Sequence, residues 1–523
     1  MRLAFVLHSH MPWLRRNGTY PAGEEWLFQV WSESYLPLIE MLERLADDGL
    51  RDVLTVGITP VLAEQMDDPY LLREFHGWLG RRLLDLQHSV QRYGGWQRDG
   101  LEPVWADHWR RQSHLLDLFE QRFLSTGLTA PFAALERAGV IQVLGGPATH
   151  PYLPLFDRAE LIRGQIDTGL ATHDRVFGSR PRGVWTPECA YRPAGAVTDP
   201  LDPHGPAAAE LPGLEDFWAE AGVDHLVLDG PTLARAAGAG DRDWAGAGGD
   251  IVPPGTPLDV LDAPVWIGDS DVAAFGRNLN VSYAVWNPFG GYPTDPWYRD
   301  FFHVDLEGGF KSWRVTSRER WDKECYEPEA AQGRALAHAG EFLDLARAHR
   351  DGRPDDGTIV AAYDTELFGH WWYEGPVWLE AVLRGAATDP RLGVTTLQTA
   401  LARRPPQGRL ALPESSWGMG KDHRAWVTDR TRWVWRAVRD AEARFAWLPE
   451  GPARAAAWRQ LTLLQASDWP FLIARDESTQ YAGERVRGHA ERFAQACAGQ
   501  SLSALAERDG FSAVVPARCP SVP

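Results

Sequence analysis

Short apolar runs recur along the chain, and each stops at polar or aromatic residues. They lie at 3–7, 53–56, 141–144, 183–185, 225–228, 359–363 and 410–412. Short and nearly continuous apolar runs are typical of parallel strands that are buried on both faces. Helical patterns lie between several of them, for example at 159–176 and 215–221. This alternation predicts an α/β fold with a parallel sheet, in which chemistry gathers at the carboxyl ends of the strands.

Two stretches break the alternation. Residues 61–135 contain no convincing strand and predict helices at 71–90 and 108–123, which indicates a helical insertion. Beyond about residue 420 the pattern is again helical, with helices expected at 430–445, capped by Asp429, and at 453–465. We therefore expect three parts: a catalytic part at 1–415, the insertion at 61–135 within it, and a C-terminal helical domain at 416–523 that contributes to the active-site cleft. The Gly/Ala/Pro-rich stretch 230–257 is expected to be a surface loop.

Composition narrows the function classes. The chain has 523 residues, with 53 basic against 71 acidic side chains and a formal net charge of −18. This balance argues against nucleic-acid binding, which depends on Lys and Arg neutralising phosphates, and against docking on an anionic membrane. Tryptophan is unusually frequent, with 25 residues, and flat aromatic faces suit sugar binding.

Targeting and cofactor motifs are not found. The apolar opening stretch is too short for a signal peptide, and no run of about 18 apolar residues could span a membrane. The cysteines are widely spaced without a metal-type pattern, which favours reduced thiols: Cys189, Cys325, Cys497 and Cys519. No Walker loop, no GxGxxG after a strand and no GxSxG occurs. We therefore expect a cytoplasmic protein, whose oligomeric state stays open.

The first candidate for chemistry is Glu188, at the end of Trp185-Thr186-Pro187-Glu188. A glutamate at a strand end, partly enclosed by aromatic side chains, can act as a nucleophile or as an acid with a shifted pKa. The alternative is a loop glutamate in a salt bridge with Arg182 or Arg192.

The second candidate is the segment after 359–363, which contains Asp364, Glu366, His370 and a pair of tryptophans. The alternative is that Asp364 caps a helix and the tryptophans are core residues. Asp364 together with Glu188 is a stronger signal, because hydrolysis of a glycosidic bond uses two carboxylates across that bond. A retaining enzyme would place them about 5–5.5 Å apart.

The third candidate is the pair His8 and His10, whose side chains leave a strand on the same face. They could bind substrate, or a metal together with His150 and Asp364; a structural role is the alternative. Further aromatic segments could stack on sugar rings or could be core: they contain Trp286, Trp297, Trp417 and Trp469.

Taken together, these segments resemble the conserved regions of glycoside hydrolase family 57. The resemblance rests on His8-Ser9-His10-Met11-Pro12, Gly57-Ile58-Thr59-Pro60, Trp185-Thr186-Pro187-Glu188 and Tyr363-Asp364-Thr365-Glu366-Leu367-Phe368-Gly369-His370-Trp371. Other segments are similar to the α-1,4-glucan branching enzymes of that family: Ala148-Thr149-His150, Tyr152-Leu153-Pro154-Leu155, Phe275-Gly276-Arg277, Gly291-Tyr292-Pro293, Pro413-Glu414-Ser415-Ser416-Trp417-Gly418 and Gln465-Ala466-Ser467-Asp468-Trp469-Pro470-Phe471. They follow the family order over nearly the whole chain.

The resemblance implies a distorted (β/α)7 barrel with a helical insertion and a C-terminal all-helical domain. It implies a retaining double displacement on α-1,4-glucan, with Glu188 as nucleophile and Asp364 as proton donor, and no metal or cofactor. The substrate-binding positions that it implies are Arg277, Thr294, Trp417, Asp468, His10, His150 and Trp286. Thr294 stands where the family usually has glycine.

Branching is one of several activities to weigh. Branching enzymes of this group carry a tyrosine on a loop over the active site, and 230–257 contains none, although Trp244 could replace it. Exclusion of water decides between transfer and hydrolysis. The alternatives are an amylase-type hydrolase, a 4-α-glucanotransferase, a metal-dependent polysaccharide deacetylase and a catalytically silent glycan-binding protein. The physiological glucan stays open.

Overall fold

The protein is built around seven parallel strands, which confirm the expected α/β class and distorted (β/α)7 barrel. The computed structural model describes residues 1–19, 22–94, 100–239, 258–287, 290–304, 309–317, 319–351 and 353–516. The strands are, in spatial order, β10 (Thr358–Asp364), β1 (Arg2–Ser9), β2 (Leu54–Ile58), β3 (Ile141–Leu144), β4 (Gly183–Trp185), β7 (His225–Leu228) and β9 (Ala273–Gly276). A single bridge between Gly145 and Val184 joins β3 to β4. The Asn278 N–H donates to the Val360 carbonyl oxygen at 2.8 Å and brings the end of β9 to β10.

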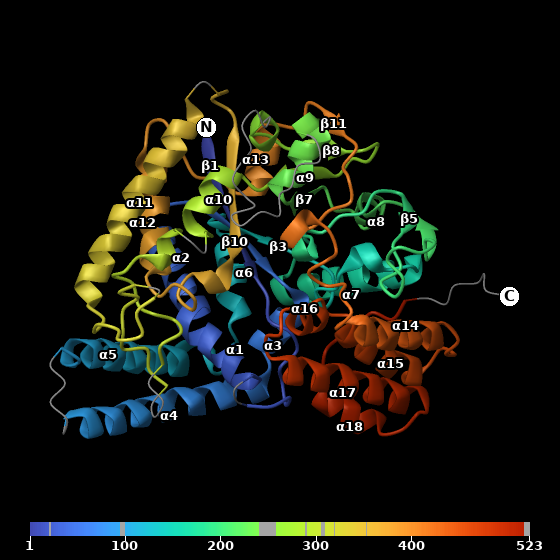
Figure 1. Cartoon of the computed structure of the whole chain (residues 1–523), viewed down its shortest axis with the longest axis horizontal. Helices are drawn as coiled ribbons and strands as arrows, with labels where there is room; N and C mark the ends of the chain where they lie inside the picture. The colour runs from blue at the N-terminus through green and yellow to red at the C-terminus, as the bar shows by residue number, and fades with distance from the viewer. Residues whose placement is uncertain are drawn as a thin grey trace.

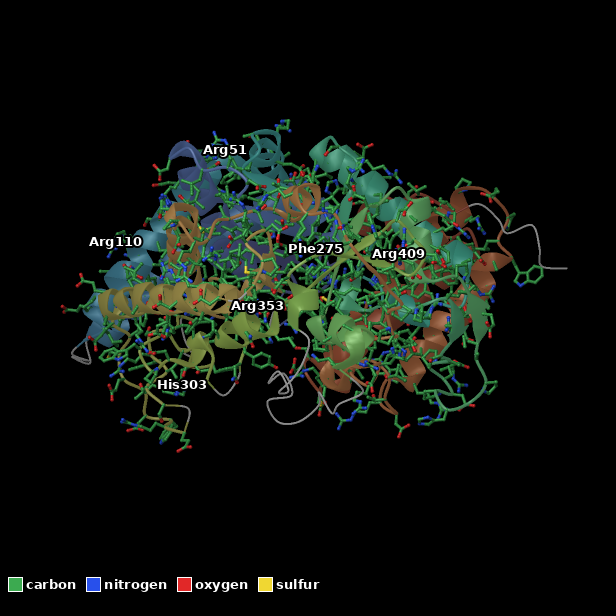
Figure 2. The ribbon with its side chains drawn as sticks, turned by 90° about the horizontal axis from the view of Figure 1, so that it is seen from above. Arg51, Arg110, Phe275, His303, Arg353 and Arg409 are labelled. Atoms are coloured by element: carbon green, nitrogen blue, oxygen red, sulfur yellow. The ribbon has the colours of Figure 1, made fainter. Side chains whose placement is uncertain are left out.

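Strand β1 shows why a nearly continuous apolar run forms here. Ala4 and Val6 point to one side and join the cluster that fills the inside of the barrel, which also contains Phe275. Phe5 points to the other side and packs on Phe342 and Trp378 of the surrounding helices, with ring centroids 5.7 and 6.0 Å apart. Both faces of the strand are therefore buried, as alternating side chains on a doubly covered strand require. In the view from above, Phe275 lies near the middle of the molecule (Figure 2).

One strand of the barrel differs from the sequence pattern. The apolar run at 410–412 does not supply a barrel strand: β11 (Arg409–Leu410) pairs with β8 (Val265–Ile267), which runs antiparallel to β9. Strand β9 itself has the sequence Ala-Ala-Phe-Gly, and its small side chains give a weak apolar signal. Small residues fit there because a Cβ on Gly276 would stand only 2.8 Å from Leu261 and 2.9 Å from Leu233.

Helices surround the barrel and form its additions. Around the barrel lie α1 (Glu24–Val30), α2 (Leu36–Asp47), α3 (Pro60–Met66), α6 (Thr129–Arg137), α7 (Ala159–Phe177), α8 (Leu214–Glu220), α9 (Gly230–Ala234), α10 (Leu279–Val285), α11 (Pro328–Arg350), α12 (Gly375–Thr388) and α13 (Leu397–Arg403). The long pair α4 (Pro69–Gly94) and α5 (Glu102–Leu118) lies side by side at one end of the molecule (Figure 1). A short hairpin, β5 (Gly195–Val197) and β6 (Ala209–Leu211), follows β4.

The C-terminal part is helical and packs on the other side. It contains α14 (Arg432–Ala446), α15 (Pro452–Leu464), α16 (Asp468–Ala474), α17 (Thr479–Cys497) and α18 (Leu502–Arg508) (Figure 1). Helix α14 begins after Thr431, so the cap expected at Asp429 is wrong. The segment after β1 reaches these helices, since the Trp13 Nε1–H donates to the Asp509 carboxylate at 3.1 Å.

The segment 230–257 is only partly a loop. Its first residues form α9, which is buried, followed by one π-helical stretch, Arg235–Ala239. Residues 240–257, with Trp244, lie outside the described residues. Within the described part of the chain, none of the helices is long and apolar enough to cross a membrane.

Candidate active site

Glu188 lies in the turn that follows β4, with its side chain held from two sides. Its backbone is left-handed (φ 61°), as is that of Cys189 (φ 45°). Such conformations cost about 1–3 kcal/mol each and persist where the surrounding structure imposes them. The Trp417 Nε1–H donates to Glu188 Oε2 at 2.8 Å, and the Ser467 hydroxyl donates to Oε1 at 2.7 Å.

The alternative of a surface salt bridge for Glu188 is wrong. Arg182 pairs with Asp224, and Arg192 donates to the backbone carbonyls of Pro193 and Pro212. Neither arginine pairs with Glu188.

A hydrogen-bonded chain leads from Glu188 back to β1. Because Ser467 donates to Glu188, its oxygen accepts from Nδ1–H of His150 at 3.0 Å. Nε2 of His150 is then the acceptor for Nε2–H of His8, also at 3.0 Å. The remaining His8 nitrogen, Nδ1, is buried and has no partner among the described residues, as this tautomer permits. Burial lowers the pKa of both histidines well below the usual value, with smaller contributions from the neighbouring imidazoles, so the chain is neutral and directs its donors toward Glu188.

Asp364 occupies the last position of β10 and is held differently. Its side chain makes no capping hydrogen bond to the turn that follows, Thr365–Leu367, so the expected alternative of a helix cap is wrong. Burial raises the pKa of Asp364 well above its usual value, the carboxylates of Glu366 and Glu188 raise it further, and Arg277 opposes them. Burial also raises the pKa of Glu188, but there the donors Ser467 and Trp417 act in the opposite direction. The pKa of both carboxyls is thus raised, further at Asp364 than at Glu188, and of the two only Glu188 has hydrogen-bond donors that oppose the shift.

Glu366 is a third carboxyl in the site and, unlike the partly exposed Glu188 and Asp364, it is buried. The backbone N–H of His10 donates to its Oε1 at 3.0 Å, and the hydroxyl of Tyr35 donates to the same oxygen. Burial raises the pKa of Glu366 to about 7, against the effect of these donors. The sequence pattern placed Glu366 in the segment of Asp364 without a role, because its partner Tyr35 lies far away along the chain.

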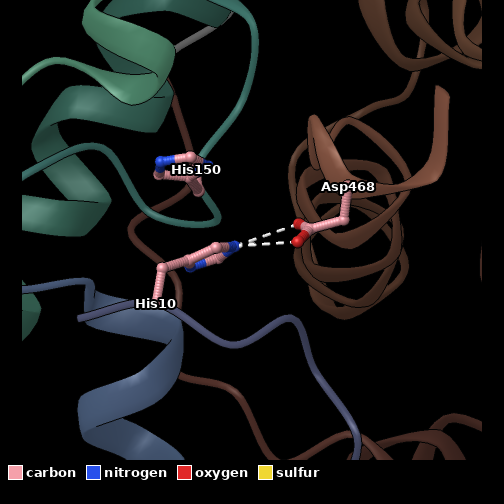
Figure 3. A group of neighbouring side chains, drawn as sticks. All are labelled: His10, His150 and Asp468. Atoms are coloured by element: carbon pink, nitrogen blue, oxygen red, sulfur yellow. Dashed lines mark hydrogen bonds and ion pairs between the residues drawn. The ribbon is translucent and has the colours of Figure 1, made fainter. Parts of the chain in front are cut away.

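His10 forms an ion pair with Asp468, the first residue of α16. His10 Nε2 lies 3.0 Å from Oδ2 of Asp468, and Nδ1 lies 3.0 Å from the hydroxyl of Thr59. Burial lowers the pKa of His10, but the charge and hydrogen bond of Asp468 outweigh it, so the pKa is raised overall. Figure 3 shows the ring of His10 with its nitrogen directed at the Asp468 carboxylate and His150 next to it, three side chains from distant parts of the chain.

The same three side chains, His10, His150 and Asp468, are close enough to be tested as a metal site, since their ligand atoms lie within 4.8 Å of one another. The imidazole rings of His10 and His150 are stacked, with centroids 4.0 Å apart and planes inclined by 20°. A metal lies in the plane of each imidazole ligand, about 2.0–2.1 Å from the nitrogen, and planes stacked in this way do not meet so close to the rings. As they lie, these side chains are arranged for hydrogen bonding and not for shared ligation.

Arg277 lies next to Trp417, the tryptophan that donates to Glu188. The guanidinium of Arg277 lies 5.8 Å from the centre of the Trp417 ring and pairs with the buried Asp229 at 2.8 Å. Lys421 reaches the other oxygen of Asp229 at 3.0 Å and donates to the backbone carbonyl of Trp417 at 3.2 Å. The Trp417 indole packs edge-on against Trp185, with centroids 5.3 Å apart. Asp229 and Lys421 were not expected from sequence, and no local motif marks them.

Thr294 and Trp286 are placed apart from this hydrogen-bonded network. Thr294 ends the short 3₁₀ turn Tyr292–Thr294, and its hydroxyl donates to the Gly291 carbonyl oxygen at 2.8 Å. Trp286 follows α10, and its side chain is 42% exposed. By contrast, Trp469 is fully buried and donates to the Leu463 carbonyl, so it is a core residue.

Comparison with known proteins identifies two regions. Residues 4–413 match the family model described as glycosyl hydrolase family 57, and residues 436–507 match the model described as 1,4-alpha-glucan branching enzyme, C-terminal. A 1,4-alpha-glucan branching enzyme of Thermococcus kodakarensis is 35% identical over 94% of this chain and 72% of its own. A probable 1,4-alpha-glucan branching enzyme of Mycobacterium tuberculosis is 36% identical over 93% of this chain and 89% of its own.

Solved structures agree with the fold. The crystal structure of a GH57 branching enzyme from Thermococcus kodakaraensis, in complex with glucose and additives, has a TM-score of 0.90 and 33% identity, over 100% of this chain and 97% of the other. The α-amylase AmyC of Thermotoga maritima has a TM-score of 0.78 over 98% of this chain and 97% of the other. Its identity of 23% makes it similar in fold alone.

Proposed function

Because the chain belongs to glycosyl hydrolase family 57, we propose that it branches α-1,4-glucans. It cleaves an α-1,4-glucosidic bond and transfers the released chain to a C6 hydroxyl, which forms an α-1,6 branch. Two observations support this activity over other activities of the fold: relatives with that printed name are 35–36% identical over most of the chain, and a branching-enzyme C-terminal model matches 436–507.

The observation that supports the mechanism is that the two carboxyls, Glu188 and Asp364, have different surroundings. Glu188 receives two hydrogen bonds that favour its charged form, whereas Asp364 is half-buried and the carboxylates of Glu366 and Glu188 raise its pKa. Glu188 attacks C1 of the glucosyl unit and forms a covalent glucosyl ester, while Asp364 gives its proton to the departing O4. Asp364, now ionised, takes the proton of the acceptor C6 hydroxyl, whose oxygen attacks C1 and releases Glu188.

The surrounding side chains bind the sugar in this proposal. His10, His150 and Asp468 take hydroxyl groups of the attacked sugar, and Trp417 offers an indole face against which Arg277 lies. Trp286 and Thr294 bind chain further away. No metal takes part in any of these steps.

The proposed parts of the chain follow the expected division. Residues 1–415 form the catalytic part with the insertion 61–135, and 416–523 form the C-terminal helical domain. That domain supplies Trp417, Ser467 and Asp468 to the cleft. Among the described residues, neither Cys189 nor Cys497 forms a disulfide, which supports action in a reducing compartment such as the cytoplasm on a glycogen-like glucan.

Hydrolysis is the second candidate, because 230–257 contains no tyrosine and water excluded poorly from the cleft would intercept the glucosyl ester. The test is incubation of purified protein with amylose, with α-1,6 linkages followed by proton NMR and by chain lengths after debranching, and reducing ends followed in parallel. We expect linkages to rise with few reducing ends. Reducing ends that rise alone would show a hydrolase, and the Glu188→Gln variant serves as the inactive control.

A further inference from the structure

A second cavity lies outside the catalytic cleft, where the segment after β1 meets α17. Its volume is about 580 Å³, within the range of small-molecule sites. Residues Asn17 and Gly18 line it from the first segment, the first turn of α17 at 478–481 from the second, and Arg485, Arg492 and Arg508 complete it. None of these residues takes part in the mechanism.

Arg485 is a buried charge without a matching carboxylate. Its side chain is nearly inaccessible (4% exposed), one guanidinium nitrogen donates to the Trp13 carbonyl at 3.1 Å, and the same nitrogen lies 2.7 Å from His489 Nε2. Among the described residues, nothing accepts a hydrogen bond from its Nε. The carboxylate of Asp509 attracts the guanidinium but pairs with Arg492. Burial lowers its pKa to about 10. Buried charges in proteins are normally paired, so this one indicates an anion that binds from outside.

The start of α17 faces the same cavity. This helix has 19 residues, and its N-cap, Ser478, makes no side-chain capping bond. The first helical bond runs from Ala482 N–H to the Ser478 carbonyl, so the N–H groups of the turn before it are available. The hydroxyl of Tyr481 on this turn is buried and, within the described part of the chain, unpartnered. A helix N-terminus with free N–H groups favours anions, phosphate above all.

Of the other two arginines on the cavity wall, Arg508 adds a second positive charge and Arg492 is paired with a carboxylate. Arg508 donates to the Arg16 carbonyl oxygen at 2.9 Å and to Asn17 Oδ1 at 2.8 Å, both neutral acceptors. Arg492 pairs with Asp509 at 2.9 Å. The acidic residue on the cavity wall is Glu484.

We propose that this cavity binds a small phosphorylated sugar. The phosphate lies at the start of α17, between Arg485, Arg508 and the Tyr481 hydroxyl. The cavity is much larger than a phosphate ion, and the remaining wall carries the side chains of Gln480 and Glu484. These two side chains hydrogen-bond each other at 2.9 Å and keep one further amide N–H and further acceptor oxygens for sugar hydroxyls. The site is separate from the glucan cleft and does not depend on the branching reaction.

The test is calorimetric titration of the full-length protein with glucose 6-phosphate, inorganic phosphate and glucose, in excess maltoheptaose to occupy the catalytic cleft. We expect glucose 6-phosphate to bind with a submillimolar Kd and glucose not to bind. Arg508→Gln should raise the Kd at least tenfold, and Tyr481→Phe, which deletes an unpartnered hydroxyl, should raise it severalfold without loss of thermal stability. Arg487→Gln is the matched control, because Arg487 lies on the same helix over the Trp433 ring, 5.5 Å away, and does not line the cavity.

Four outcomes would overturn the proposal. Absence of heat with glucose 6-phosphate would remove the site. Equal weakening by Arg508→Gln and Arg487→Gln would indicate non-specific attraction to basic charge. Glucose binding as tightly as its phosphate would indicate a neutral sugar site, and inorganic phosphate binding as tightly as glucose 6-phosphate would remove the sugar from the assignment.

Discussion

The side chains of Glu188 and Asp364 are held in place by opposite kinds of surroundings. Glu188 accepts hydrogen bonds from Trp417 and Ser467, side chains that lie more than two hundred residues further along the chain. Asp364 is placed by its own strand, is not used to cap the turn after it, and is half-buried near Glu366. Donors stabilise a charged carboxylate, and burial among like charges stabilises a protonated one.

The contrast shows two different requirements: the orientation of the Glu188 side chain and the proton affinity of Asp364. In the proposed mechanism the nucleophile, Glu188, needs a fixed direction and a negative charge, and the hydrogen bonds from Trp417 and Ser467 favour both. The acid needs only a proton at working pH, and removal of water and donors is enough. If Glu188 and Asp364 act as proposed, the hydrogen bonds that hold Glu188 form only when the barrel and the segment of Ser467 are assembled.

The largest expected effect comes from the carboxylates themselves. Glu188→Gln and Asp364→Asn should each lower kcat on amylose by at least about 10³-fold, because one loses the covalent route and the other the proton donor. Initial rates of linkage formation measure this, with circular dichroism to show that the variants are folded. A wild-type rate in either variant would show that the substituted carboxyl is not catalytic.

The donors to Glu188 come next. Ser467→Ala and Trp417→Phe each remove one hydrogen bond to a charged group, worth roughly 1.5–3 kcal/mol or about 10–100-fold in kcat. Trp435→Phe is the matched control, because its Nε1–H donates to the Trp426 carbonyl at 3.0 Å, away from the cleft. If both donor variants changed only KM, Glu188 would not depend on them for its charge.

The acid can be tested through its neighbour. Activity should fall at low pH as Glu188 is protonated and at high pH as Asp364 loses its proton. Glu366→Gln removes a like charge, so the pKa of Asp364 falls and the alkaline limb of kcat/KM moves to lower pH, by about one unit. Glu374→Gln is the control, since burial also raises the pKa of Glu374 to about 7 but its partner is Tyr326. An alkaline limb that stays in place would show that Glu366 does not tune the acid.

The smallest effect is expected at Thr294. Its hydroxyl is used within its own turn, so Thr294→Gly should change KM for amylose by less than about threefold, in the range of a surface substitution. Steady-state kinetics measure this. A tenfold rise in KM would mean that the threonine side chain itself binds glucan.

Much of the barrel and both carboxylates could be predicted from the sequence. Apolar runs at 3–7, 141–144 and 359–363 correspond to β1, β3 and β10, because strands buried on both faces carry a continuous signal. The barrel strand Ala273–Gly276 could not be found in this way, since its residues are small and the run is short.

The supporting network was less accessible. Ser467 lies next to Asp468 in a segment that resembles the family, which is a signal for Ser467 as a site residue. Its hydrogen bond to Glu188, however, joins positions 279 residues apart, and no local pattern predicts it. The pairing of Arg277 with Asp229 and Lys421 is likewise made only by the fold. Sequence patterns show where chemistry-bearing residues lie, and tertiary contacts decide which of them hold the others.

The most direct test uses a substrate whose leaving group needs no proton. α-Maltotriosyl fluoride releases fluoride without acid assistance, so only the nucleophile is required to form the glucosyl ester. We predict that Asp364→Asn releases a burst of fluoride at a rate within about tenfold of wild type, and that Glu188→Gln releases none. A burst from Glu188→Gln, or equal silence of both variants, would contradict the assignment of nucleophile and acid on which the whole account depends.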